Sequence, residues 1–214
     1  MDFIEIEVKF FLADSASIRR RLLAIDRPAS KRVFESNIRF EDETRSLLHK
    51  ESLLRLRQDT LTTLTYKSRA GIPDEQFKIH QEIEVEISDF NAMIHILEAL
   101  GYHREQVYEK YRETFVQAET TVCLDELPFG DFLEIEGTRE NIRAMADRLG
   151  LHWGKRILKN YLFIFDRLRN KMKLPFLDIT FDNFKTIQLD KAICRQLFES
   201  LEADRNGGTG AAPE

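Results

Sequence analysis

Apolar and charged residues alternate one by one along several segments of the chain, which is the pattern of a β-strand with one apolar and one charged face. The clearest examples are residues 4–10, 54–57 and 82–87. A less strict alternation marks residues 32–41, 61–69, 105–117, 120–126 and 131–136. The pattern therefore predicts about eight strands.

Helical periodicity separates several of these strands. Two helices have an N-cap residue before them and a glycine after them: residues 89–100 between Ser88 and Gly101, and residues 139–149 between Thr138 and Gly150. Periodicity alone indicates three more helices, at residues 15–25, 156–169 and 188–203. Together with the strands, they predict a fold of the α+β class.

The tetrapeptide Glu-Ile-Glu-Val occurs at residues 5–8 and again at residues 82–85, each time ahead of a predicted helix and strand. Two interpretations stay open: an internal duplication, or a chance repeat in an acidic protein. Two antiparallel halves of about four strands each could close into one barrel, which would remove exposed sheet edges.

Charged residues two positions apart share one face of a strand, because alternate side chains point to opposite faces. Pairs or triplets of like charge recur in several strands: Glu5 and Glu7 (with Lys9), Arg55 and Arg57, Glu82, Glu84 and Glu86, Lys110 and Arg112, and Glu134 and Glu136. For one strand, a solvated face is the ordinary explanation. However, glutamate is depleted in strands, and like charges repel unless ions of opposite sign lie between them. We therefore expect the charged faces to point into a barrel and the apolar faces to carry the helices.

Composition and charge exclude several classes of protein. The chain has 214 residues, a formal net charge of -5 and a pI of about 5.7, whereas a general nucleic-acid binder is expected to be basic. Cys123 and Cys194 are far apart and the histidines are scattered, which argues against a disulfide scaffold and a zinc site. No stretch approaches the ~18 apolar residues of a membrane span, and no secretory signal is visible at the amino terminus. We expect a cytoplasmic protein whose metal, if it has one, is held by oxygen ligands.

Charges of both signs inside one barrel suit polyphosphate chemistry. A barrel of about eight strands encloses room for one small ligand. Carboxylates hold Mg²⁺ or Mn²⁺ together with substrate phosphates, and Arg and Lys neutralise phosphoryl oxygens. Phosphoryl transfer needs mainly positioning and charge stabilisation from the protein.

A series of short motifs in fixed order resembles the CYTH family, also called triphosphate tunnel metalloenzymes. The first is the ExExK signature, Glu5-Ile6-Glu7-Val8-Lys9. The others are Leu54-Arg55-Leu56-Arg57, Thr65-Tyr66-Lys67, Glu82-Ile83-Glu84-Val85-Glu86, Tyr108-Glu109-Lys110-Tyr111-Arg112, Leu124-Asp125-Glu126-Leu127 and Phe132-Leu133-Glu134-Ile135-Glu136-Gly137. Asn160-Tyr161-Leu162 is similar to the family's Ser-Tyr-x-x-Leu segment, with asparagine in place of serine. The ordered set extends from residue 3 to about residue 168.

The resemblance implies the triphosphate tunnel fold, a closed antiparallel eight-stranded β-barrel with helices packed outside. On this basis we expect a tunnel domain over residues 1–169 and a C-terminal helical extension over residues 170–205. Residues 206–214 are rich in glycine and alanine, and we expect them to form a disordered tail.

The same resemblance assigns roles residue by residue. It implies metal ligands at Glu5, Glu7, Asp125, Glu134 and Glu136, for Mg²⁺ or Mn²⁺. It implies phosphate-binding groups at Lys9, Arg55, Arg57, Lys67, Lys110, Arg112 and Lys159. Glu82 and Glu84 would support this network, and the catalytic set would be Glu5, Glu7, Lys9, Glu134 and Glu136.

Two reactions are compatible with these residues. A triphosphatase hydrolyses tripolyphosphate, a nucleoside triphosphate or thiamine triphosphate, whereas a class IV adenylyl cyclase converts ATP to cyclic AMP and pyrophosphate. We favour the triphosphatase, because hydrolysis needs only the phosphate site; a non-catalytic polyphosphate-binding module is a further alternative. The expected partner is a small triphosphate, with no nucleic acid and no membrane, and a homodimer is left open.

Overall fold

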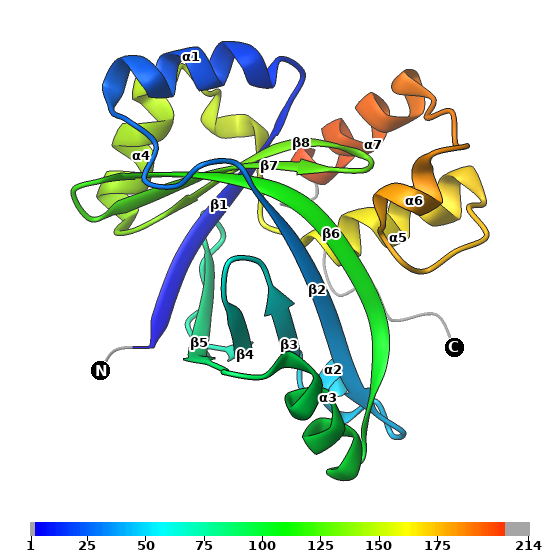
Figure 1. Cartoon of the computed structure of the whole chain (residues 1–214). Coiled ribbons are helices and arrows are strands. Elements are labelled where there is room, and N and C mark those ends of the chain that lie inside the picture. Colours follow the sequence, from blue (N-terminus) through cyan, green and yellow to red (C-terminus); the bar gives the residue numbers. More distant parts are fainter. Residues whose placement is uncertain (1–2, 204–214) are drawn as a thin grey trace.

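Eight antiparallel strands close into a barrel, as the sequence predicts (Figure 1). The computed structural model describes residues 3–203, so the expected tail at 206–214 lies outside the described residues. The strands of the barrel are β1 (Ile4–Leu12), β2 (Val33–Asp42), β3 (Leu53–Gln58), β4 (Thr62–Arg69), β5 (Lys78–Glu86), β6 (Tyr102–Gln117), β7 (Thr120–Leu127) and β8 (Gly130–Glu136). They follow the order β5-β4-β3-β2-β6-β7-β8-β1, and the pairing of β1 with β5 closes the ring.

A ninth strand, β9 (Arg156–Ile157), pairs with β1 at Lys9 and Phe10. The expected helix from residue 156 is therefore wrong at its start. That helix begins at Tyr161, after Asn160, whose side chain accepts a hydrogen bond from the backbone N–H of Phe163. An N-cap of this kind fixes the first turn.

Seven helices lie outside the barrel among the described residues (Figure 1). They are α1 (Ser15–Ile25), α2 (Ser46–His49), α3 (Phe90–Ala99), α4 (Arg139–Arg148), α5 (Tyr161–Met172), α6 (Phe181–Phe184) and α7 (Lys191–Ala203), with a 3₁₀ turn η1 (Trp153–Lys155). The two four-residue helices, α2 and α6, are too short to give a periodic pattern. None of the helices in residues 3–203 is long and apolar enough to cross a membrane.

An aspartate and a threonine cap the two helices that end before a glycine, α3 and α4. Thr138 caps α4 as expected and accepts a hydrogen bond from the backbone N–H of Asn141. For α3 the predicted cap, Ser88, is wrong: Asp89 accepts the bond, from the backbone N–H of Ala92. Both residues are good caps, so sequence preference alone does not separate neighbours.

The apolar faces of the strands point outward and form three clusters under the helices. Helices α1 and α4 cover one cluster, in which Leu22 and Ile142 are fully buried. Helices α2 and α3 cover a second, around Leu56 and Ile94. Helices α5, α6 and α7 cover the third. Because the apolar shell lies outside the barrel, the inside is left to the charged faces.

The C-terminal helices pack on the barrel itself. Phe198 of α7 stacks on Phe11 of β1, with ring centroids 4.2 Å apart, and meets Phe132 of β8 edge to face at 5.5 Å. Phe198 is 1% exposed. The expected boundary between a tunnel domain and an extension, at residue 169, falls inside α5.

Replacing Phe198 by alanine should lower the free energy of unfolding by about 3–5 kcal/mol, because the change leaves a cavity between α7 and the barrel. Urea denaturation of the full chain measures this. Arg195→Ala, at an exposed position of the same helix, should change stability by less than about 0.5 kcal/mol. A loss below about 1 kcal/mol for Phe198→Ala would mean that α7 does not pack on the barrel in solution.

Candidate functional site

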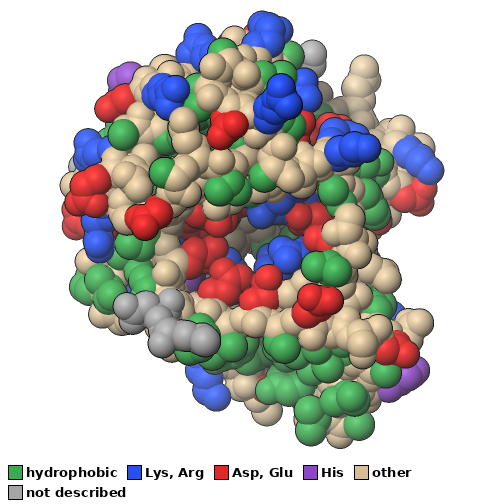
Figure 2. All heavy atoms as spheres, turned by 60° about the vertical axis from the view of Figure 1, so that its left-hand side comes forward, with side chains coloured by type: hydrophobic (Ala, Val, Ile, Leu, Met, Phe, Trp, Pro, Cys, Tyr) green, Lys and Arg blue, Asp and Glu red, His purple; other side chains and the backbone are tan. Residues whose placement is uncertain are grey.

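A cavity of about 1610 Å³ occupies the barrel and opens at its rim. Acidic and basic side chains line it in nearly equal number, and Figure 2 looks into the hollow where they face one another. The charged faces of the strands therefore point inward, which confirms the prediction from their alternation.

Three glutamates meet at one point of this cavity, and we call them the acid cluster: Glu5, Glu7 and Glu136. Glu7 of β1 lies directly opposite Glu136 of β8 in the sheet register, and Glu5 shares the face of Glu7. One carboxylate oxygen from each lies within 4.8 Å of the others. Burial, with the charges of Glu134 and Glu5 adding to it, raises the pKa of Glu136 to about 8. The negative charge of the acid cluster is thus only partly neutralised by the cations around it.

Two lysines lie against the acid cluster: Lys67 comes from β4 and Lys9 from β1 itself. Lys67 Nζ is 2.6 Å from Glu5 Oε2 and 2.9 Å from Glu82 Oε2. Lys9 Nζ is 2.8 Å from Glu7 Oε2. Burial alone would lower the pKa of Lys9, but Glu134 and Glu7 raise it above its usual value. Both lysines are therefore fixed cations.

A third lysine at the acid cluster, Lys78, was not predicted. It lies opposite Glu7 in the sheet and forms an ion pair with it. Burial, together with the nearby charges of Lys9 and Lys67, lowers its pKa in spite of Glu7. The signal was present in the sequence, because Lys78 and His80 alternate with Phe77 and Ile79 and so extend the strand at 82–87 backwards.

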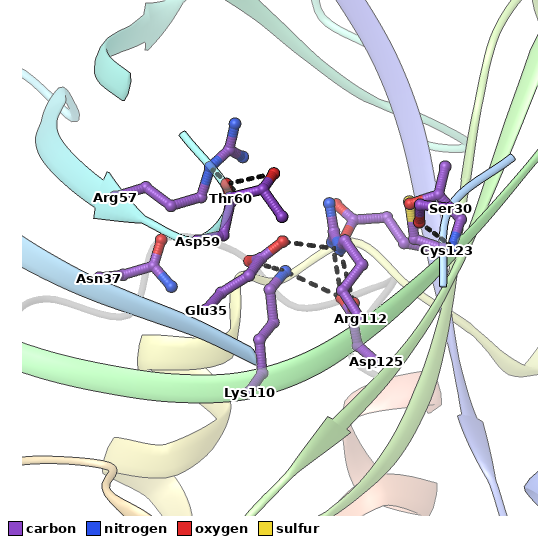
Figure 3. A network of polar contacts seen from close by, with 12 residues as sticks. Ser30, Glu35, Asn37, Arg57, Asp59, Thr60, Lys110, Arg112, Cys123 and Asp125 are labelled. Atoms are coloured by element: carbon purple, nitrogen blue, oxygen red, sulfur yellow. Dashed lines mark hydrogen bonds and ion pairs between the residues drawn. The ribbon is translucent and has the colours of Figure 1, made fainter. Parts of the chain in front are cut away.

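A second group of charges, the buried network, lies on β6, β7, β8 and α5: Lys110, Arg112, Asp125, Glu134 and Tyr161. Arg112 donates two hydrogen bonds of 2.6 Å to Asp125 and a third of 2.6 Å to Glu134 (Figure 3 shows the contact with Asp125). Lys110 Nζ donates to Asp125 at 3.1 Å, and the Tyr161 hydroxyl donates to the same carboxylate at 2.8 Å. Asp125 thus accepts from three side chains.

Glu134 joins the buried network to the acid cluster. Lys9 Nζ lies 2.7 Å from Glu134 and 2.8 Å from Glu7, so one ammonium bridges the two groups. Against the effect of burial, Lys9 and Arg112 hold the pKa of Glu134 well below its usual range. Glu134 is therefore an anion paired with two cations.

Strand β3 directs two arginines into the cavity. Arg55 Nη2 donates to Thr65 Oγ1 at 3.1 Å and lies 3.6 Å from Glu84. Arg57 Nη2 donates to Glu84 at 3.3 Å. The Nε–H group of Arg55 is buried and has no hydrogen-bond acceptor among the described residues. Glu82 and Glu84 lie beside the basic groups that they are predicted to support.

Residues 4–150, more than half of the chain, match the profile of the CYTH domain. This chain belongs to the CYTH family. The CYTH family includes triphosphatases and adenylyl cyclase-like enzymes, and its tunnel enzymes are metal-dependent in general. No curated protein matches the chain significantly.

Solved structures share the CYTH fold. A Vibrio parahaemolyticus protein described as a candidate adenylate cyclase is 21% identical, with a TM-score of 0.68 over 76% of this chain and 98% of its own. The PH1819 protein of Pyrococcus horikoshii OT3 is 26% identical, with a TM-score of 0.63 over 77% and 99%. HpAC1 from Hippeastrum, for which a dominant triphosphatase activity is stated, is 16% identical, with a TM-score of 0.55 over 76% and 95%.

The donor atoms of the acid cluster suit a divalent metal ion, the kind of cofactor on which CYTH tunnel enzymes in general depend. Three carboxylates converge in the acid cluster, and carboxylate oxygens are the protein ligands that Mg²⁺ and Mn²⁺ prefer. The raised pKa of Glu136 marks an excess of negative charge that a cation would offset. Glu5, Glu7 and Glu136 therefore fit one divalent cation.

The other two predicted metal ligands of the CYTH resemblance lie elsewhere in this structure. Asp125 and Glu134 are outside the acid cluster and are held by cations of the buried network. Their role as metal ligands stays a prediction. Lys159, a predicted phosphate-binding group, is exposed at the cavity rim with Nζ 5.1 Å from the centre of the Phe163 ring, and its role also stays a prediction.

Two further residues, Glu35 and Tyr161, belong to the charged interior but are not among the predicted site residues. Glu35 of β2 is 4% exposed, with Oε2 3.4 Å from Lys110 Nζ, as Figure 3 shows. It shares one face of β2 with Asn37 and Arg39, and this polar face was the available signal. Tyr161 is the first residue of α5, where strand alternation does not apply, so only the motif around Asn160 could have pointed to it.

Proposed function

We propose that the protein is a divalent-metal-dependent triphosphatase. The observation that supports this most is the closed channel itself, in which the acid cluster lies beside Lys9, Lys67 and Lys78. A ligand that carries several negative charges would pair with the lysines, and a divalent cation bound to that ligand would pair with the acid cluster. A triphosphate is such a ligand.

The chain's own residues supply binding and charge. Glu5, Glu7 and Glu136 would hold the cation, which when bound polarises a phosphoryl group and activates water. Arg55 and Arg57 would bind phosphoryl oxygens through their planar guanidinium groups. Because the interior has a low dielectric constant, these charges act more strongly there than in water.

The ion pairs of the acid cluster suggest that two lysines would change partners when metal and substrate bind. Lys67 and Lys78 now neutralise Glu5 and Glu7. A divalent cation on these carboxylates would take over that task and release both ammonium groups for phosphoryl oxygens. The channel would then bind metal and triphosphate cooperatively, since each offsets the charge that the other brings.

The cyclase alternative uses the same phosphate site but also needs a pocket for adenine and an aligned ribose hydroxyl. Hydrolysis needs only phosphates, metal and water, and this supports the triphosphatase. The stated triphosphatase activity of HpAC1 is in line with hydrolysis on this fold.

Release of phosphate from tripolyphosphate and from ATP, with and without Mg²⁺ or Mn²⁺, tests the proposal when cyclic AMP is measured in parallel. The triphosphatase gives metal-dependent phosphate and no cyclic AMP. Cyclic AMP with pyrophosphate would overturn it in favour of the cyclase. Tight metal-free binding without any product would overturn it in favour of a binding module.

Arg57→Ala should raise the KM for tripolyphosphate by about tenfold or more, because a charged hydrogen-bond donor to the phosphates is lost. The stability of this variant should change by less than about 1 kcal/mol, since Glu84, one partner of Arg57, is 39% exposed and partly exposed ion pairs contribute little. Steady-state kinetics and thermal melting measure both. Arg104→Ala, an exposed arginine paired with Glu98, is the control, and an unchanged KM for Arg57→Ala would remove that residue from the phosphate site.

A further inference from the structure

A row of basic side chains leads from the acid cluster to the rim of the cavity, and we call it the basic row. Its members come from β5, β4, β3, β2 and the residue before α2, and all of them line the cavity: Lys78, Lys67, Arg55, Arg39 and Arg45. The first four are largely buried, whereas the side chain of Arg45 is 56% exposed. The basic row therefore continues beyond the groups that a triphosphate at the acid cluster would need.

Arg39 and Arg55 are the central pair of the basic row. They lie directly opposite each other on β2 and β3, and like charges in that position repel. The Nε–H groups of both are buried without a hydrogen-bond acceptor among the described residues. Their Nη2 atoms lie near carboxylates, Glu105 for Arg39 and Glu84 for Arg55. Buried donors are normally satisfied, so each guanidinium group retains donor capacity for a further acceptor.

A β-bulge shapes the outer end of the basic row. The register between β2 and β6 shifts after Arg39, so that Glu105 has no partner on β2. Bulges re-aim side chains, and here Glu105 Oε1 lies 3.2 Å from Arg39 Nη2 and 2.9 Å from Arg45 Nη2. One carboxylate thus holds two guanidinium groups side by side, and the trio keeps a net positive charge.

We propose that Arg39 and Arg45 form an outer anion subsite that binds phosphoryl groups beyond the third. The ligand would be linear inorganic polyphosphate longer than tripolyphosphate, and this deepens the proposed function, on which it rests. Guanidinium groups bind phosphoryl oxygens in a bidentate manner. The cavity of about 1610 Å³ also exceeds the roughly 300–1,000 Å³ of ordinary small-molecule sites. A nucleoside would place an uncharged base against this charged rim.

Calorimetric titration of the full chain with tripolyphosphate and with linear hexapolyphosphate tests the proposal. EDTA is present throughout, so that metal-dependent hydrolysis cannot occur and binding is measured apart from turnover. The wild type should bind hexapolyphosphate more tightly. Arg39→Gln should weaken hexapolyphosphate binding about tenfold and leave tripolyphosphate within about twofold; Arg45→Gln should act in the same direction.

Matched variants separate a subsite from a general loss of charge or fold. Arg104→Gln removes the same charge from the exposed arginine next to Glu105 in sequence, and should change neither affinity. Arg39→Lys keeps the charge but not the bidentate guanidinium group, and should retain part of the preference for hexapolyphosphate even if Arg39→Gln folds poorly.

Two results would overturn the outer subsite: equal weakening of both ligands by Arg39→Gln, or no weakening of either. If the preference for hexapolyphosphate holds while no phosphate is released with metal, the proposed hydrolysis fails and the subsite stands.

Discussion

Glu7→Gln should reduce metal-dependent release of phosphate from tripolyphosphate by more than about 100-fold. Loss of groups that only support metal ligands costs roughly 10–100-fold, and Glu7 is a direct member of the acid cluster. Its side chain is 1% exposed, so solvent cannot replace the lost carboxylate. Phosphate release at saturating Mg²⁺ and Mn²⁺ measures the effect.

Glu7 also pairs with Lys9 and Lys78, so its loss affects stability as well as metal binding. Glu136→Gln separates the two effects, because no described Lys or Arg lies within ion-pair distance of Glu136. It should lose activity and remain folded by thermal melting. Glu126→Gln, on β7 and paired with exposed Arg32, should keep full activity. Activity within about threefold of wild type for both Glu7→Gln and Glu136→Gln would contradict the metal site.

Asp125→Asn should lower the free energy of unfolding by about 3–5 kcal/mol, since breaking a buried ion pair leaves charges without compensation. Asp125 accepts hydrogen bonds from Lys110, Arg112 and Tyr161 and is 2% exposed. Asparagine keeps the shape but removes the negative charge that offsets the two cations. Chemical denaturation at neutral pH measures the loss.

Asp147→Asn, at an exposed position of α4, is the matched control and should change stability by less than about 0.5 kcal/mol. The metal affinity of Asp125→Asn gives a second result, because Asp125 lies outside the acid cluster. A variant that is as stable as wild type but has lost metal binding would contradict the present geometry and place Asp125 among the metal ligands.

Much of the architecture was predictable because strand alternation is a local property of the sequence. The charges of residues 5–9 and 134–136 share a face in any strand, whatever lies beside it. Eight such segments, with helices able to cover their apolar faces, leave few ways to arrange the charges. A charged interior can be expected from this without knowledge of register, whereas the closed eight-stranded barrel was implied by the resemblance to the CYTH family.

Alternation could not predict which glutamates meet in the acid cluster, because it does not determine the register between distant strands. Glu7 meets Glu136 because β1 and β8 pair in one particular register. A shift by two residues would keep every side chain on its face and bring Glu134 to that place instead. Asp125 and Glu134 were grouped with the other carboxylates through the resemblance to the CYTH family, and in this structure they lie among Lys9, Lys110 and Arg112.

Short elements and single positions also escaped prediction. The pairing of Arg156 and Ile157 with β1 depends on a tertiary contact that two residues cannot signal. Glu105 is re-aimed by a bulge, and Tyr161 reaches the buried network from the first turn of a helix. The position of each of these residues depends on where a strand or helix ends or bends, and the hydrophobic pattern of the sequence does not determine this.

Anomalous scattering from crystals grown with Mn²⁺ and tripolyphosphate is the most direct test of how the channel works. The expected result is Mn²⁺ among the carboxylates of Glu5, Glu7 and Glu136, with phosphoryl oxygens against Lys67 and Arg55. Mn²⁺ bound only on the outer surface, or a tripolyphosphate that stays outside the barrel, would contradict the account.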